Sequence, residues 1–282
     1  MHRFAAIQMA SGPNVHANLN EAARLVEQAV DSGAVLVVLP ENFAHMGVGE
    51  ADKLDVKEKP GHGVMQEFLS VTSAKHGIWL VGGSIPMQAE HPDKVRAACL
   101  IYNDKGHQVA RYDKIHLFDV HVEESGENYT ESLTIEAGDK TVVVDTPFGK
   151  LGVAVCYDLR FPEIFRELLA QGMEICAVPS AFTAITGRAH WEILVRARAI
   201  ENLSYVIASA QGGYHVNGRE TYGDSMIVGP WGKVLDRLAS GSGYVIADFD
   251  PDRLHATRRN FPSIEHARLS CNFAQLGGTA DI

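Results

Sequence analysis

Apolar runs and amphipathic stretches alternate along this chain. The apolar runs are mostly continuous, which is typical of strands covered on both faces. They predict strands over 4–9, 35–39, 79–85, 97–102, 141–144, 151–155, 175–178, 205–210, 225–228 and 244–249. A hydrophobic stripe with helical spacing predicts helices over 18–32, 65–76, 162–171 and 190–202.

Helices alternate with strands in each half of the chain, and a hairpin interrupts the alternation where a turn containing Gly106 joins 97–102 to 108–112. This mixture predicts an α/β fold, a four-layer α-β-β-α sandwich of helix, sheet, sheet and helix. The 282 residues contain no low-complexity linker or short-period repeat, so we expect a single domain over 1–282. The stretch 121–139 is rich in Glu, Ser and Gly and predicts a long loop.

Composition narrows the possible partners. Hydrophobic residues make up 46% of the chain and charged residues 21%, as in a globular protein with a sizeable core. A net charge of −10 and a pI near 5.7 argue against nucleic acid or an anionic membrane as a partner. No apolar run reaches the length of a membrane-spanning helix. Residues 1–9 lack the apolar region of a secretory signal and resemble a first strand.

The four cysteines and thirteen histidines suggest neither a disulfide framework nor a metal site. The cysteines lie at 99, 156, 176 and 271 and form no C-x-x-C pair, so we expect a reducing cytoplasm. The histidines are scattered and form no H-x-x-x-H or H-E-x-x-H pattern on a predicted helix. We therefore expect no metal and no other cofactor.

One cysteine stands where a strand is expected to meet a helix. The apolar run 151–155 ends at Cys156, and a short polar turn leads to Pro162, which fits a first helical turn because its missing N–H would have no partner there. Backbone N–H groups and a helix N-terminus favour negative charge beside this thiol. The setting can stabilise a thiolate or an oxyanion, although a strand-end cysteine is also a common core residue.

Two further ionisable residues follow expected strands. Glu41 comes after the apolar run 35–39, and Lys114 comes after the second strand of the hairpin. Ligands collect at the carboxyl ends of strands in α/β sheets. A carboxylate, an ammonium and a thiol meeting there would form a nucleophile with a base and an electrostatic stabiliser. Each residue alone is explained equally well as loop or surface charge, so the hypothesis depends on their joint occurrence.

The surroundings of these residues resemble the nitrilase superfamily of carbon–nitrogen hydrolases. That family's Glu–Lys–Cys triad is matched by Leu-Pro-Glu41-Asn, Tyr-Asp-Lys114-Ile-His-Leu-Phe-Asp and Cys156-Tyr-Asp-Leu-Arg-Phe-Pro-Glu, and its second glutamate by Tyr-Thr-Glu131-Ser. The resemblance runs over about 4–249, which we take as the domain core. It implies the α-β-β-α sandwich, a homodimer or higher homo-oligomer, and a tail over 250–282 that reaches a subunit interface.

The resemblance also implies a mechanism. Glu41 would take the proton of Cys156, and the thiolate would attack an amide carbon. The Lys114 ammonium and the backbone N–H of Tyr157 would stabilise the tetrahedral oxyanion. Ammonia would leave with the proton held by Glu41, and water would hydrolyse the thioester. Glu131 would position Lys114 or the substrate amide, unless it is a loop glutamate that merely pairs with a nearby base.

Within the superfamily, the closest resemblance is to the branch of deaminated glutathione amidases, with ω-amidases as a neighbouring branch. Segments 114–120, 178–192, 196–202, 211–213 and 222–232 carry it, and Asp224 replaces the His of many relatives. Both branches act on small α-keto acid amides, so the pocket needs a cation. Arg160, at a position where the family holds a carboxylate, is the candidate, unless it braces the turn through Asp158 or Glu163.

Phe182 and Thr186 match family pocket positions and would supply an apolar wall and a hydroxyl; core packing and helix capping are their alternatives. We expect an enzyme that hydrolyses the primary-amide-bearing side of deaminated glutathione, or a similar small α-keto acid amide, through a cysteine thioester. An ω-amidase acting on α-ketoglutaramate or a related dicarboxylic monoamide is the alternative. From another class, the chain could be an inactive binding protein on the same fold, but Glu41, Lys114 and Cys156 together argue against that.

Overall fold

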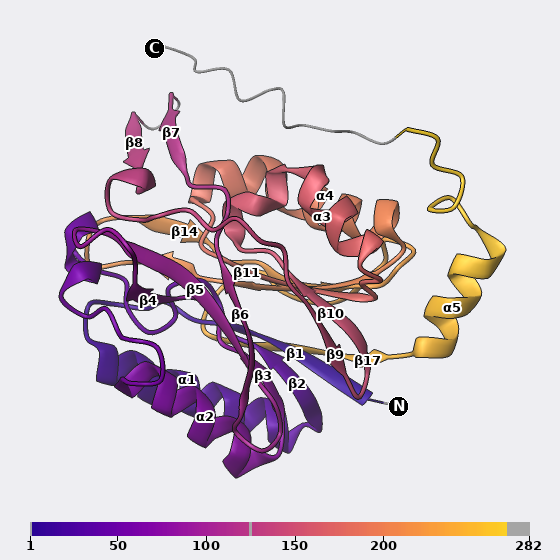
Figure 1. The fold of residues 1–282 in the computed structure, drawn as a ribbon, viewed down its shortest axis with the longest axis horizontal. Coiled ribbons are helices and arrows are strands. Elements are labelled where there is room, and N and C mark those ends of the chain that lie inside the picture. The colour runs from indigo at the N-terminus through magenta and orange to yellow at the C-terminus, as the bar shows by residue number, and fades with distance from the viewer. Residues whose placement is uncertain (1, 124–125, 270–282) are drawn as a thin grey trace.

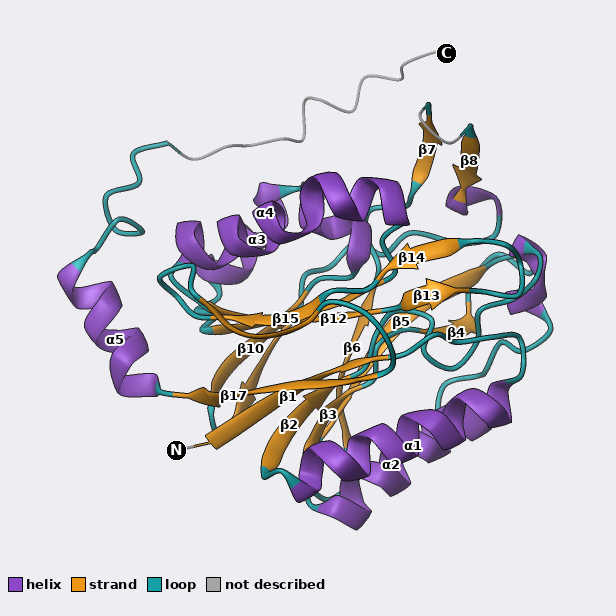
Figure 2. Ribbon diagram, turned by 180° about the vertical axis from the view of Figure 1, so that it is seen from behind, coloured by secondary structure: helices purple, strands orange, loops and turns teal. Residues whose placement is uncertain are grey.

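The computed structural model describes residues 2–123 and 126–269. Two β-sheets face each other, and helices cover their outer sides (Figure 1 and Figure 2). Helices α1 (Val15–Asp31) and α2 (Val64–His76) lie on one sheet, and α3 (Pro162–Ala170) and α4 (Ala184–Asn202) lie on the other. The α-β-β-α sandwich predicted from the sequence is confirmed. The expected tail over 250–282 is described as far as residue 269; residues 1, 124–125 and 270–282 lie outside the described residues.

The first sheet is built mainly from the N-terminal part of the chain. Its strands are β1 (His2–Gln8), β2 (Ala34–Val38), β3 (Trp79–Val81), β4 (Ile85–Gln88), β5 (Val95–Tyr102), β6 (Gln108–Asp113) and β17 (Gly243–Phe249). They run in the order β17-β1-β2-β3-β5-β4, with β6 also paired to β5. Strands β1, β2 and β3 are parallel. Their nearly continuous burial explains why they read as apolar runs rather than alternating ones.

The second sheet holds the strand that leads to Cys156. Its strands are β9 (Val143–Thr146), β10 (Gly149–Val153), β11 (Ile175–Ser180), β12 (Tyr205–Ala210), β15 (Ser225–Val228) and β16 (Val234–Leu238). They run in the order β16-β15-β12-β11-β10-β9, with β10, β11 and β12 parallel. A parallel bridge joins Met9, just after β1, to Gln211, just after β12. The carboxyl ends of the parallel strands in both sheets therefore open at one edge of the sandwich.

The helices follow their sequence signals, with two differences. Helix α4 begins at Ala184 rather than at 190, because the Thr183 hydroxyl accepts a hydrogen bond from the Thr186 N–H and caps the helix there. Helix α5 (Pro251–Asn260), capped by Asp250, was not expected. Only Leu254 of α5 is buried, so the helix has almost no apolar stripe by which the sequence could reveal it.

Three stretches of strand and loop also differ from expectation. The run 79–85 forms two strands, β3 and β4, because Gly82 and Gly83 separate them. The expected loop over 121–139 contains the hairpin β7 (Asp119–Val122) and β8 (Glu127–Thr130) and the short 3-10 helix η2 (Glu131–Leu133). A second small hairpin pairs β13 (Gly212–Tyr214) with β14 (Glu220–Tyr222). The strands of both hairpins and β16 contain no continuous apolar run, so the hydrophobic pattern of the sequence did not predict them.

Within the described part of the chain, no helix has both the length and the apolar character needed to cross a bilayer.

The remaining short helices are η1 (Glu50–Leu54) and η3 (Cys156–Arg160). Both lie at the edge of the sandwich where the parallel strands end, beside the pocket described below.

Gly83 lets the chain pass close to the loop that carries Glu41. Its φ is +57°, in the left-handed region, and a Cβ added there would lie 2.1 Å from the carbonyl oxygen of Pro40. A side chain therefore cannot be placed at this position unless the backbone just before Glu41 shifts.

We expect Gly83→Ala to lower the free energy of unfolding more than Gly61→Ala does. Gly61 also has a positive φ, of +79°, but nothing lies within 4 Å of an added Cβ. Alanine at Gly61 should cost only the left-handed penalty of about 1–2 kcal/mol, whereas at Gly83 the backbone collision adds to it. Urea denaturation of the two variants measures the difference, and equal losses would contradict the close approach.

Candidate active site

The turn that carries Cys156 has an uncommon backbone conformation. Cys156 begins η3 with a φ of 50°, in the left-handed region. A non-glycine residue there costs of order 1–3 kcal/mol and persists only where its surroundings hold it. Asp158 supplies that support: it is fully buried and accepts hydrogen bonds from the Val155 N–H at 2.8 Å, from the Tyr112 hydroxyl and from the His116 N–H at 3.0 Å. The sequence reasoning did not assign this role to Asp158.

Glu41 lies in the loop after β2, with only 3% of its surface exposed. Two buried side chains fix the backbone of this loop. The Ser84 hydroxyl accepts a hydrogen bond from the Asn42 N–H at 2.9 Å, and the Gln211 side-chain amide donates to the carbonyl of Glu41 at 3.0 Å. These two hydrogen bonds hold the Glu41 carboxylate at the edge of the sandwich where Cys156 also lies.

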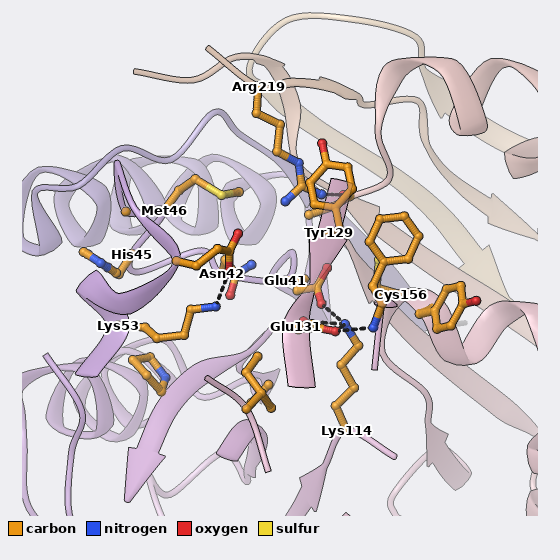
Figure 3. A pocket seen from close by; sticks show the side chains of 18 of the residues that line it. Glu41, Asn42, His45, Met46, Lys53, Lys114, Tyr129, Glu131, Cys156 and Arg219 are labelled. Atoms are coloured by element: carbon orange, nitrogen blue, oxygen red, sulfur yellow. Dashed lines mark hydrogen bonds and ion pairs between the residues drawn. The ribbon is translucent and has the colours of Figure 1, made fainter. Parts of the chain in front are cut away.

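Lys114 follows β6 and places its ammonium between two carboxylates (Figure 3). The Nζ atom lies 2.8 Å from Glu41 Oε1 and 2.9 and 2.8 Å from the two carboxylate oxygens of Glu131. Glu131 begins η2, and its Oε2 also accepts a hydrogen bond from the Phe118 N–H at 2.7 Å. Lys114 is 2% exposed, so this ion cluster is almost completely removed from water.

Burial and neighbouring charges act together on these groups. Burial would lower the pKa of Lys114, but the carboxylates of Glu131 and Glu41 outweigh it and hold the pKa well above its usual value. Burial is the largest effect and would raise the pKa of Glu131, but the Lys114 charge and the hydrogen bonds from Lys114 and the Phe118 N–H together lower that pKa. Lys114 and Glu131 are therefore both held in their charged forms.

The Cys156 thiol is affected in the opposite way. Burial is the largest effect and the Glu41 charge the next, and together they raise the pKa of the thiol well above its usual value. Lys114 and a hydrogen bond from the backbone of Ala181 lower it by less. Glu41 lines the same pocket as the thiol and lies close enough to raise its pKa. Cys156 is thus a neutral thiol beside a carboxylate that can take its proton.

The cluster lies at the bottom of a pocket with about 980 Å³ of empty space, part of it open to solvent. The four residues expected to contact the substrate, Tyr157, Arg160, Phe182 and Thr186, all line it. The Arg160 guanidinium lies over the ring of Phe182 at 5.1 Å and bonds to His190 at 3.1 Å. It forms no ion pair within the described residues, so the bracing of the turn through Asp158 or Glu163 is not observed.

Phe182 and Thr186 both line the pocket, and each also has a structural contact. The Phe182 ring contacts Trp191 at 5.0 Å, so it also packs the core. The Thr186 hydroxyl lies 2.8 Å from that of Thr183, which is the residue that caps α4, and Thr186 itself is in the first turn of the helix.

Asp224, where many relatives have His, lies apart from the pocket lining. Its carboxylate pairs with Arg237 at 2.7 Å, and its carbonyl accepts a hydrogen bond from the Trp191 indole N–H at 2.7 Å. The replacement therefore changes a buried support behind α4 and leaves the pocket surface unaltered.

Other lining residues were not expected from the sequence. They include Phe118 just before β7 and Tyr129 in β8, together with Lys53 and Arg219. Only their positions in the fold bring them to the pocket, and no local pattern marks them. Among the residues that the structure describes, no group of three or more His, Cys, Asp or Glu side chains is arranged to hold a metal ion.

Comparison with known proteins defines the class to which this fold and pocket belong. A family model described as carbon-nitrogen hydrolase matches residues 3–259. The chain belongs to this family of carbon–nitrogen hydrolases, and it is a hydrolase that acts on amides. The motif resemblance is thereby confirmed.

Two kinds of relative support this assignment. The chain is 43% identical over 265 residues to a Synechocystis protein named deaminated glutathione amidase, covering 93% of this chain and 96% of that one. The Saccharomyces cerevisiae Nit3 structure, of the nitrilase superfamily, superposes with a TM-score of 0.83 at 32% identity, covering 93% and 94% of the two chains. The Caenorhabditis elegans NitFhit structure gives 0.87 at 34% identity; it covers 95% of this chain, which spans only 65% of that one.

The opposite effects of Glu41 and Lys114 on the thiol give a testable pH dependence. Glu41→Gln removes a negative neighbour and should lower the pKa of Cys156, whereas Lys114→Met removes a positive neighbour and should raise it. The rate of iodoacetamide alkylation as a function of pH reports the thiolate fraction and therefore measures both shifts.

A Cys271→Ser background removes the cysteine that lies outside the described residues, and Cys99 and Cys176 are fully buried with raised pKa values because of that burial. Circular dichroism must show that both variants are folded. A shift of the alkylation profile to higher pH in Glu41→Gln would contradict the geometry even if Lys114→Met does not fold.

Proposed function

We propose that Glu41, Lys114 and Cys156 are the catalytic residues of an amidase and that Glu131 positions Lys114. One observation carries the proposal: a single buried ammonium bonds to both carboxylates, and one of these carboxylates lies close enough to the Cys156 thiol to raise its pKa. Nothing in the packing of the sandwich requires three ionisable groups at this place. Burying these ionisable groups costs free energy, and a catalytic role would explain why the fold retains them.

In the proposed reaction, Glu41 takes the thiol proton as the sulfur attacks the amide carbon. The oxygen that becomes negative is stabilised by the Lys114 ammonium and by the N–H of Tyr157 in the first turn of η3. Glu41 then gives the proton to the departing amine, which leaves a thioester. Water, activated by Glu41, attacks the thioester and releases the acid with the thiol restored.

We propose deaminated glutathione as the substrate. Relatives of this chain carry that name at high coverage, and Arg160 offers a guanidinium without a carboxylate partner to the keto-acid carboxylate. The pocket is partly open to solvent, so a substrate can extend from the ion cluster toward the mouth of the pocket. An ω-amidase acting on α-ketoglutaramate is the second candidate, because Arg160 would serve a single carboxylate equally well.

Purified protein given deaminated glutathione, α-ketoglutaramate, glutamine and a simple nitrile should turn over the first most rapidly, with release of each product acid as the readout. Cys156→Ala should remove turnover while leaving the thermal midpoint nearly unchanged, and Lys114→Met should lower kcat by about 10²–10³-fold. Faster turnover of α-ketoglutaramate would favour the ω-amidase. No turnover of any substrate would reject the enzyme proposal.

We further propose that the single domain assembles into a homodimer through the outer face of α4. Large apolar side chains are exposed there: Ile193 at 69% and Ile200 at 48% on the helix, with Trp231 at 61% and Phe261 at 52% nearby. The Trp231 and Phe261 rings are in contact at 5.3 Å. A contiguous apolar patch of this kind marks an interaction surface.

The free cysteines at 99, 156 and 176 support the proposal of a reducing cytoplasm as the location of the protein.

Light scattering after size exclusion should give twice the 30.7 kDa of one chain, or a higher multiple. Replacing Ile193 and Ile200 together by Glu should give the monomer, because two desolvated carboxylates would face each other across the interface. Val71→Glu, at a 57% exposed position on α2, is the matched control and should leave the mass unchanged. A monomeric wild-type protein would refute the proposed assembly.

A further inference from the structure

The pocket carries more positive charge than the rest of the molecule. The chain as a whole has a net charge of −10. The pocket lining, however, places four cationic side chains against three carboxylates: Lys53, Lys114, Arg160 and Arg219 against Glu41, Glu50 and Glu131. An anionic ligand is therefore attracted to this pocket in spite of the acidic surface around it.

Most of these charges are already paired. Lys114 is bonded to both buried glutamates, and Lys53 lies 2.7 Å from Glu50. The two arginines differ: within residues 2–123 and 126–269, neither Arg160 nor Arg219 forms an ion pair with a carboxylate. Two guanidinium groups are thus available for ligand anions. The proposed mechanism assigns one of them, Arg160, and leaves Arg219 without a role.

Arg219 is held at the wall of the pocket by uncharged contacts. Its Nη2 donates to the carbonyl of Ala181, and its guanidinium carbon lies 5.1 Å from the centre of the Tyr129 ring (Figure 3). Its Nε is buried and has no hydrogen-bond partner among the described residues. A buried donor without a partner costs about 1–3 kcal/mol, so an acceptor arriving beside it would be favoured.

The contact with Ala181 fixes how far Arg219 lies from the reacting sulfur. The backbone of Ala181 lies close enough to the Cys156 thiol to lower its pKa, and the carbonyl of the same residue accepts a hydrogen bond from Arg219. One peptide residue thus separates the guanidinium from the sulfur. Arg160 is joined to Cys156 differently, through η3, and lies against Phe182. The two arginines therefore approach the sulfur from different walls of one pocket.

We propose that Arg219 binds a second anionic group, on the amine side of the scissile amide, so that the preferred substrates are amides with a carboxylate on each side. This inference rests on the proposed amidase function and deepens it. Deaminated glutathione has this pattern, because its keto-acid carboxylate and its glycine carboxylate flank the γ-amide. α-Ketoglutaramate has only the carboxylate on the acyl side, since its leaving group is ammonia.

Three substrates separate the role of Arg219 from that of the catalytic residues. They are deaminated glutathione, its analogue with the glycine carboxylate converted to a carboxamide, and α-ketoglutaramate. Arg219→Met should lower kcat/KM for deaminated glutathione by about 10- to 100-fold, the range for a charge-assisted hydrogen bond. It should leave kcat/KM for the other two substrates within about twofold, which also shows that the variant is folded.

Two control variants complete the design. Arg188→Met removes the same charge from an exposed position of α4 outside the pocket lining, and should change none of the three rates by more than about twofold. Arg219→Lys keeps the charge but loses the planar fork, and should fall between wild type and Arg219→Met. If Arg219→Met lowers all three rates equally, or changes none of them, the proposal is wrong.

A binding measurement distinguishes failure of this proposal from failure of the proposed function. Calorimetry on Cys156→Ala measures the Kd of deaminated glutathione without turnover, and the Cys156→Ala, Arg219→Met double variant should bind about 10- to 100-fold more weakly. If the wild type binds this acid but does not hydrolyse it, the substrate assignment fails and the two Kd values still decide the role of Arg219. If Cys156→Ala does not bind it, both proposals are rejected.

Discussion

The rest of the site depends on one buried ion: the ammonium of Lys114 between the carboxylates of Glu41 and Glu131. Removing three charges from water is expensive, and leaving one of them without its partner typically costs 3–5 kcal/mol. The three side chains come from the ends of β2 and β6 and from η2, which lie far apart in the sequence. The loops after these elements therefore cannot move independently without separating the charges. The same ion cluster therefore maintains the geometry of the site and the positions of the loops that carry it.

This cluster also determines the state of the thiol. The Glu41 carboxylate lies 2.8 Å from the Lys114 ammonium and also acts on the pKa of the Cys156 thiol. Burial raises the pKa of the thiol, so in the proposed mechanism proton transfer accompanies attack and a free thiolate does not accumulate. The left-handed backbone of Cys156, supported by Asp158, sets the direction in which the sulfur faces. A buried neutral thiol is less prone to alkylation and oxidation than a resting thiolate.

The sequence predicted the features that are encoded by residues close together in the chain. Strands, the main helices and the residues Glu41, Lys114 and Cys156 all lie next to apolar runs or caps, and the layered fold followed from them. Asp158, Tyr129 and Arg219 could not be assigned, because each acts through a contact with a distant segment. Arg219, for example, lies in a polar hairpin that reaches Ala181 only because Thr221 pairs with Thr183. Helix α5 and the hairpin of β7 and β8 were missed for a related reason: they bury too little apolar surface to leave a periodic pattern.

The contrast between the acidic molecule and its cationic pocket has a physical consequence for selectivity. Fields from exposed charges decay over roughly 8 Å at physiological ionic strength, so a small acid inside the pocket responds mainly to the arginines beside it. A long polyanion cannot enter the pocket completely. The excess of carboxylates on the outer surface repels the part that stays outside. The same two arginines would otherwise attract any phosphate-bearing polymer. Net charge on the outside and unpaired guanidinium groups on the inside therefore restrict binding to anions small enough to enter completely.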